Sequence, residues 1–114
     1  MKVRDYLQIE PVEDVPGVLR RVAIGAEDGA PRFAMRVFEV SPGSSTPFHS
    51  HWWEHEVFVL SGEGLVKSQE GEKSIAEGTV VYIAPDEEHC FANSGNDVLR
   101  FICVIPLVNR RVDI

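Results

Sequence analysis

Short apolar segments separated by turn residues run along almost the whole chain. Each segment is rich in Val, Ile or Phe, and none shows a helical period with caps. Turn residues divide them, such as the Ser-Pro-Gly-Ser run at 41–44 and the Asn-Ser-Gly-Asn run at 93–96. Several short strands at regular spacing are typical of a β-sandwich or a β-barrel. The pattern therefore predicts an all-β fold whose strands cover residues 19–24, 33–40, 56–60, 64–69, 79–84, 89–92 and 98–105.

The length and charge of the chain limit its organisation and its partners. With 114 residues and no long linker, it is expected to form a single domain over residues 1–114. Its 18 acidic residues outnumber its 11 Lys and Arg residues, which are scattered, and the net charge is −7. A surface that binds phosphate groups needs clustered basic residues. Neither nucleic acid nor a membrane is therefore expected as a partner.

The distribution of apolar residues also bears on location. The N-terminus lacks the apolar region of a signal peptide, and the longest apolar stretch, residues 101–108, is short and contains Pro106. The spacing of the two cysteines, Cys90 and Cys103, matches neither a zinc motif nor a redox motif. The expectation is a cytoplasmic protein with both thiols reduced.

The four histidines are the candidate metal-binding residues of the chain. His49, His51 and His55 lie within seven residues, and His89 opens a later apolar segment. On an extended segment His49 and His51 share one face. If the two tryptophans that follow make a turn, His55 opens the next strand and faces inward. Neutral imidazole nitrogens suit Mn, Fe, Co, Ni, Cu or Zn, so the sequence predicts a metal site.

These spacings resemble the cupin superfamily. Its first motif matches Gly43, then His49 and His51, then position 55, then Gly62, so that it covers about residues 43–62. The family usually has Glu where this chain has His55. The resemblance implies a cupin double-stranded β-helix, which is a jelly-roll barrel.

The second cupin motif covers about residues 78–93 and is less regular. It matches at Gly78, Pro85, His89 and Asn93. Gly78 lies one residue further from Pro85 than usual. The interval from proline to histidine is one residue shorter and lacks its glycine. Two motifs in the right order make the resemblance specific.

The identity of one metal ligand stays open between two neighbours. Glu56 also fits a looser form of the first motif, whereas the count back from Gly62 selects His55. The run from His51 onward is similar to that of small single-domain cupins with a four-histidine manganese site. The resemblance implies one divalent transition metal per chain on His49, His51, His55 and His89. Manganese is favoured, and Fe, Ni, Co, Cu and Zn are alternatives.

Alternation along the strands predicts what surrounds the metal. With Arg100 facing water, Phe101, Cys103 and Ile105 point inward, and Ile102 and Val104 point outward. The resemblance implies that the inward residues, together with Phe91, wall the metal cavity. The orientation of Arg36 stays open: facing inward it needs an anionic partner or ligand, and facing outward it is an ordinary strand charge.

Two classes of function are compatible with these features. The first, which the sequence favours, is a small-molecule oxidoreductase of oxygenase or dioxygenase type; isomerase or hydrolase chemistry is a weaker variant. The second is a non-catalytic barrel that binds a small ligand or a metal as a sensor or a store. Similar small cupins form homodimers, and an N-terminal strand within residues 1–10 is expected to be exchanged between the two copies.

Overall fold

The computed structural model describes residues 1–107, and over these residues the fold is all-β. Two 3-10 turns, Tyr6–Gln8 and Ala26–Asp28, are the only helical segments in this part of the chain. The strands are β1 (Val12–Val15), β2 (Val18–Ile24), β3 (Phe33–Val40), β4 (His55–Ser61), β5 (Glu63–Ser68), β6 (Gly71–Ala76), β7 (Val80–Ile83), β8 (His89–Ala92) and β9 (Leu99–Pro106). Within residues 1–107 there is no helix that could span a membrane.

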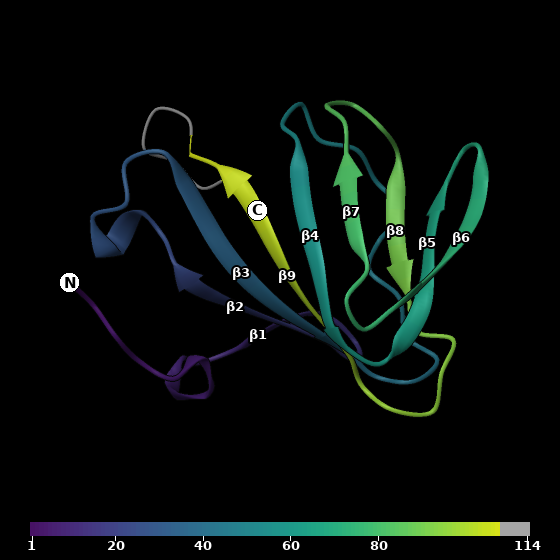
Figure 1. The fold of residues 1–114 in the computed structure, drawn as a ribbon, viewed down its shortest axis with the longest axis horizontal. Coiled ribbons are helices and arrows are strands. Elements are labelled where there is room, and N and C mark those ends of the chain that lie inside the picture. The colour runs from purple at the N-terminus through teal and green to yellow at the C-terminus, as the bar shows by residue number, and fades with distance from the viewer. Residues whose placement is uncertain (108–114) are drawn as a thin grey trace.

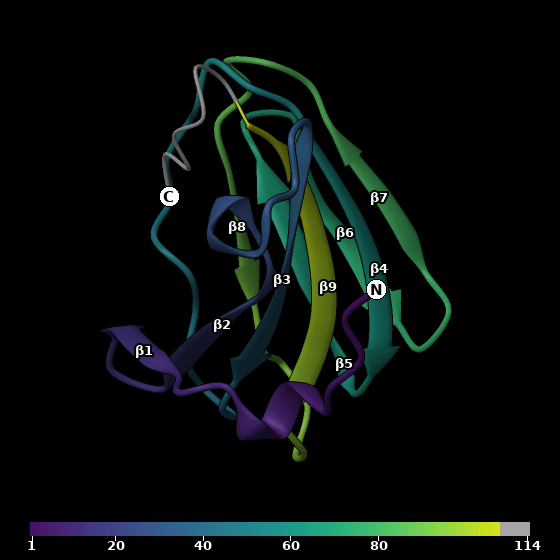
Figure 2. The ribbon, with the colours of Figure 1, turned by 90° about the vertical axis from the view of Figure 1, so that its left-hand side faces the viewer.

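The strands form two antiparallel sheets that face each other. The larger sheet has the order β1-β2-β3-β9-β4-β7, and the smaller has the order β6-β5-β8 (Figure 1). Figure 2 shows β1 and β7 at opposite edges of the larger sheet. Residues 45–49 extend the smaller sheet, because isolated bridges pair Ser45 with Ala92 and His49 with His89. This arrangement confirms the predicted jelly-roll barrel.

The hydrophobic core lies between the two sheets. Alternation along β9 buries Leu99, Phe101, Cys103 and Ile105, and leaves the residues between them half-buried. The predicted inward face of β9 is thus confirmed. Full burial of a side chain such as Phe101 contributes roughly 1.5–3 kcal/mol to stability.

One motif glycine holds the turn between β4 and β5. Gly62 has a φ of 88°, in the left-handed region that favours glycine. A Cβ atom at this position would also overlap the carbonyl oxygen of Val98. Gly62 therefore permits β4 to turn directly beside the chain that leads into β9.

The sequence pattern missed two strands, β1 and β6. In β1 and β6 nearly all side chains are exposed or half-buried, and both strands lie at sheet edges, so they lack apolar alternation. Residues 1–10 contain no strand in this single chain, and the Asp5 side chain accepts a hydrogen bond from Leu7 N and caps a 3-10 turn. The expected exchange of this segment between two copies stays a prediction.

Candidate metal centre

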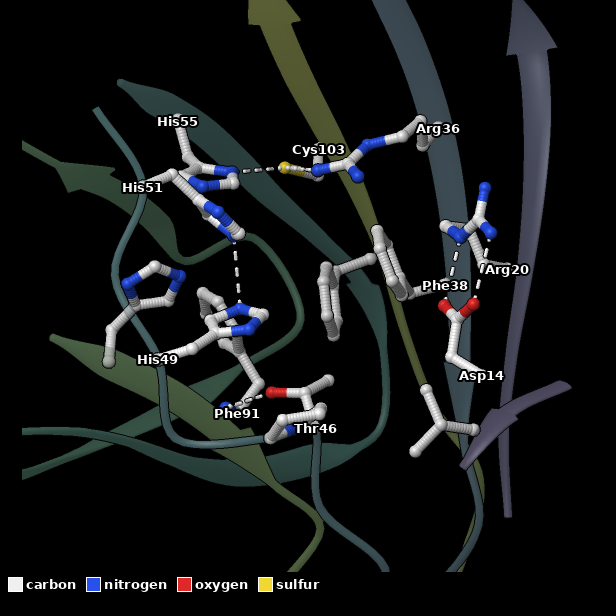
Figure 3. Close-up of a pocket in the computed structure, with 14 residues that line it drawn as sticks. Asp14, Arg20, Arg36, Phe38, Thr46, His49, His51, His55, Phe91 and Cys103 are labelled. Carbon is white, nitrogen blue, oxygen red and sulfur yellow. Dashed lines mark hydrogen bonds and ion pairs between the residues drawn. The ribbon is translucent and has the colours of Figure 1, made fainter. Parts of the chain in front are cut away.

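A cavity of about 300 Å³ lies between the two sheets and contains all four histidines (Figure 3). It has an imidazole-rich end, an aromatic middle and a charged end. Its lining residues are Asp14, Val18, Arg20, Arg36, Phe38, Thr46, Pro47, His49, His51, His55, His89, Phe91, Phe101 and Cys103.

Backbone pairing brings His49 and His89 together, although they are distant in sequence. His49 N donates to His89 O at 3.1 Å, and His89 N donates to His49 O at 2.9 Å. Nearby, Phe91 N donates to the Thr46 hydroxyl at 2.8 Å. Residues 45–49, which lead into the first histidines, are therefore held against β8 by hydrogen bonds.

Three of the imidazoles converge closely enough to bind one metal ion. The available ligand atoms of His49, His51 and His89 all lie within 4.8 Å of one another. The Nε2 atoms of His49 and His51 are 3.1 Å apart. Two nitrogens bound to one ion at about 2.1 Å and at right angles would be separated by about 3 Å, so this donor set fits a divalent transition metal.

His55 lies beside this group without belonging to the tightest cluster. Its ring centroid is 5.1 Å from that of His51 and 5.0 Å from that of His89. Its Nδ1 atom is 3.1 Å from Cys103 Sγ, while its buried Nε2 atom has no hydrogen-bond partner within residues 1–107. The free Nε2 atom of His55, beside three converging imidazoles, could bind the same metal ion. A role of His55 as the fourth ligand stays a prediction.

The environment lowers the pKa of three of the histidines. Burial, reinforced by the neighbouring histidines and by Arg36, lowers the pKa of His51 to about 4. Burial together with the charge of Arg36 lowers the pKa of His55 to about 3. Burial also lowers the pKa of His49. Their nitrogen lone pairs are therefore available near pH 7, as metal binding requires.

Glu56, the alternative ligand, lies elsewhere. Alternation along β4 buries His55, Val57 and Val59 and exposes Glu56. Glu56 is not among the residues that line the cavity, and it borders grooves on the outer face of the sheet. The carboxylate alternative therefore has no support in this structure.

Of the five residues expected around the metal, four line the cavity. Arg36, Phe91, Phe101 and Cys103 do so, and Arg36 is thereby resolved as facing inward. Ile105 also points inward, but it is buried in the hydrophobic core at 1% exposure and is not among the residues that line this cavity. It pairs with Ala34, two residues beyond the pairing of Arg36 with Cys103, and the cavity does not extend that far.

The charged end of the cavity was not predicted. Arg20 on β2 donates to both carboxylate oxygens of Asp14 on β1, at 2.8 and 3.0 Å. In Figure 3 this pair lies at the opposite end of the cavity from His49 and His51. Because β1 carries no apolar alternation, the sequence did not indicate that this strand, and with it Asp14, lines the cavity.

Two further residues from the motif regions are buried outside the cavity lining. The buried Trp53 ring stacks on His51, with centroids 4.4 Å apart and an interplanar angle of 8°. The motif residue Asn93 donates to Val40 O and to Asp97 O, both at 2.8 Å. Asn93 thus ties the turn after β8 to β3, which is a structural role.

Comparison with known proteins assigns the family. The chain belongs to the cupins, because residues 36–105 match the family described as Cupin domain. It is similar to the polyketide cyclase RemF from Streptomyces resistomycificus, at 32% identity and a TM-score of 0.87. That likeness covers 100% of this chain and 87% of RemF.

Two further relatives come from Thermotoga maritima. A structure described as a predicted oxalate decarboxylase is 28% identical, with a TM-score of 0.79, over 95% of this chain and 100% of that one. An oxalate-binding protein is 35% identical over 71 residues, which are 61% of this chain and 59% of that protein. The chain thus matches somewhat more than half of that relative's length.

Proposed function

We propose that this protein is a small-molecule enzyme that uses one divalent metal ion held by His49, His51, His55 and His89. The observation that carries the proposal is the convergence of three imidazoles at one end of the cavity. When bound there, such an ion would act as a Lewis acid toward an oxygen atom of the substrate. Manganese is the metal that the sequence resemblance favours, and imidazole also accommodates Fe, Ni, Co, Cu and Zn.

The surrounding residues would bind and orient the substrate. Phe38, Phe91 and Phe101 form a continuous aromatic wall, with ring centroids 5.1 Å apart for Phe38 and Phe101 and 4.7 Å apart for Phe91 and Phe101. Such a wall favours a flat, partly apolar molecule and excludes water from it. Arg36 would stabilise negative charge that develops on a substrate oxygen.

The likeness to RemF supports a cyclisation as the reaction. It extends over the whole chain at 32% identity and a TM-score of 0.87, whereas the Thermotoga maritima structure described as a predicted oxalate decarboxylase covers 95% of the chain at 28% identity and a TM-score of 0.79. In a cyclisation of this kind, a methyl or methylene carbon gives up a proton to solvent and forms a bond to a ketone carbon of the same molecule, whose oxygen takes up a proton from solvent. The resulting hydroxyl group and a neighbouring hydrogen then leave as water, and a carbon–carbon double bond forms. Such chemistry needs no oxidant.

An oxygenase, the reaction type expected from the sequence, is the second candidate. All-imidazole donor sets also suit redox-active metals, and no separate acid–base pair lies beside the histidines among residues 1–107. The charged pair Asp14 and Arg20 is at the other end of the cavity and is mutually engaged. A non-catalytic binding barrel is the third candidate, and the name of the oxalate-binding relative supports it.

One assay separates these three functions. The probe is 2,4,6-heptanetrione, a short linear triketone that can close to 5-methylresorcinol with loss of one water. We expect the metal-loaded protein to accelerate this closure without oxygen uptake, and His49→Ala to abolish the acceleration. Oxygen uptake that depends on His49 would support the oxygenase instead, and saturable binding without turnover would support a binding barrel.

We further propose a homodimer that forms through the outer face of β4, β7 and β9. Phe58, Val80 and Tyr82 are exposed on this face, and Ile102 and Val104 are half-buried beside them. Contiguous exposed apolar side chains commonly mark a protein interface. Exchange of the N-terminal segment, residues 1–10, remains part of this proposal.

A further inference from the structure

Arg36 is a buried cation whose strand position directs it into the cavity. Alternation along β3 buries Ala34, Arg36, Phe38 and Val40, and Arg36 is only 4% exposed. Its NH2 group donates to Cys103 Sγ at 3.2 Å, and its guanidinium carbon lies 5.0 Å from the centre of the Phe38 ring. Both partners are uncharged.

No anion within residues 1–107 compensates this guanidinium. None of the ion pairs found there includes Arg36, and its Nε atom is buried without a hydrogen-bond partner. Asp14 is the one carboxylate among the residues that line the cavity, and Arg20 occupies both of its oxygens. Burying an unpaired charge is costly, and contacts with a thiol and an aromatic face offset only part of that cost.

The cavity is therefore positive inside an acidic protein. Two arginines and one aspartate line it, while the whole chain carries a net charge of −7. A bound divalent cation would add further positive charge, so an anionic ligand would be attracted with or without the metal.

We propose that the cavity binds a flat carboxylate whose carboxylate group is held by Arg36 and which carries a second oxygen close to the carboxylate. The guanidinium fork matches a carboxylate, and Phe38, Phe91 and Phe101 match a planar body. The Arg36 NH2 group and the His55 Nδ1 atom lie 3.2 and 3.1 Å from the same sulfur atom, so the carboxylate end of the ligand lies beside the histidines. The placement of the second oxygen toward a metal rests on the proposed function, whereas the placement of the carboxylate does not.

The test compares salicylate with its uncharged counterpart salicylamide. Both are flat and carry a neighbouring oxygen, and only salicylate has a carboxylate. Their affinities are measured by isothermal titration calorimetry at pH 7, in chelator-treated and in zinc-loaded protein. The variants are Arg36→Met, which keeps an unbranched side chain without charge, and Arg32→Met, a control at an exposed position outside the cavity.

We expect the parent protein and Arg32→Met to bind salicylate at least about 10-fold more tightly than salicylamide, in both metal states. Arg36→Met should lose this preference in both states. Zinc should tighten salicylate binding by the parent protein. If zinc has no effect but the dependence on Arg36 persists, the proposed metal function fails while the carboxylate site stands.

Three results would overturn the carboxylate site. One is a parent protein without preference for salicylate. Another is an Arg36→Met variant that keeps the preference. The third is binding of phosphate or chloride as tight as that of salicylate, which would show a general anion site. If Arg36→Met does not fold, Arg36→Lys takes its place, and we expect it to retain a reduced preference because Lys provides charge without the planar fork.

Discussion

The sulfur of Cys103 lies 3.1 Å from Nδ1 of His55, on the side of the imidazole that faces away from its unpartnered Nε2 atom. Arg36 donates to the same sulfur, so the sulfur lies between a guanidinium donor and the imidazole of His55. With the proton on Nδ1 of His55 and donated to sulfur, the lone pair on Nε2 is available to a cation. Burial raises the pKa of the Cys103 thiol, which keeps it uncharged in this role.

Replacing Cys103 should therefore weaken metal binding. Hydrogen-bond partners of metal-binding histidines commonly contribute 10- to 100-fold to affinity. We expect Cys103→Val to weaken zinc binding by about 10-fold or more, and Cys103→Ser, which keeps an acceptor, to have a smaller effect. Competition with a chromophoric chelator measures the affinity. Cys90→Ala is the control, since Cys90 is buried but does not line the cavity; an unchanged affinity in Cys103→Val would contradict the role.

The stacking of Trp53 on His51 leads to a second prediction. Trp53→Leu should destabilise the protein by about 2 kcal/mol, because it leaves space in the core. It should also weaken zinc binding several-fold, because the ring that holds His51 in place is lost. Urea unfolding and chelator competition measure the two effects. Trp52→Leu, at a neighbouring exposed position, should change neither; a metal affinity equal to that of the parent in Trp53→Leu would show that the stack does not position His51.

The lowered pKa values predict how the stability of metal-free protein depends on pH. Below the ordinary histidine pKa of 6.5, the unfolded chain binds protons that folded His51 and His55 do not bind until about pH 4 and 3. The unfolded state therefore gains protons, and the folded state loses stability, as the pH falls below 6.5. Above pH 6.5 these two histidines are neutral in both states and the full stability is present. Between pH 7 and 5 the loss should be on the order of 1 kcal/mol for His55, and less for half-buried His51, where water screens the charge.

Urea unfolding at pH 7 and pH 5, after chelator treatment, tests this dependence. The double variant His51→Gln/His55→Gln should lose less stability over this interval than the parent protein does. Equal losses in the two proteins would show that these histidines are not the source of the pH dependence.

The outer face of β4, β7 and β9 predicts an oligomeric state. The parent protein should behave as a dimer at micromolar concentration in sizing with light scattering. Phe58→Glu and Tyr82→Glu should each shift it toward monomer, because both side chains are exposed on this face. Val98→Glu, an exposed apolar position in the turn before β9, should leave the dimer intact. A monomeric parent protein would refute the proposed interface.

Much of the fold could be predicted because the site-bearing strands have one buried and one exposed face. Alternation placed His55 with Val57 and Val59, and placed Phe101 and Cys103 inward, as the structure shows. The exposed edge strands β1 and β6 carry no such alternation, so they were missed.

How far the cavity extends along the strands could not be predicted from the sequence. Alternation gives the direction of a side chain, but it does not give the depth of the cavity along the strand. Ile105 therefore points inward as expected and still lies in the core. The orientation of Arg36 could not be predicted because both faces of β3 carry apolar residues. In the structure Arg36 is paired with Cys103 on the neighbouring strand β9, and both side chains point inward. The Asp14–Arg20 pair depends on β1 and was not foreseen.

Under the proposed function, His55 and not Glu56 completes the metal centre with His49, His51 and His89. Elemental analysis of tag-free protein, alongside His55→Ala and Glu56→Ala, tests it most directly. The account predicts about one transition-metal ion per chain in the parent protein and in Glu56→Ala, and a marked loss in His55→Ala. Loss in Glu56→Ala alone, or no metal in the parent protein even after reconstitution, would contradict it.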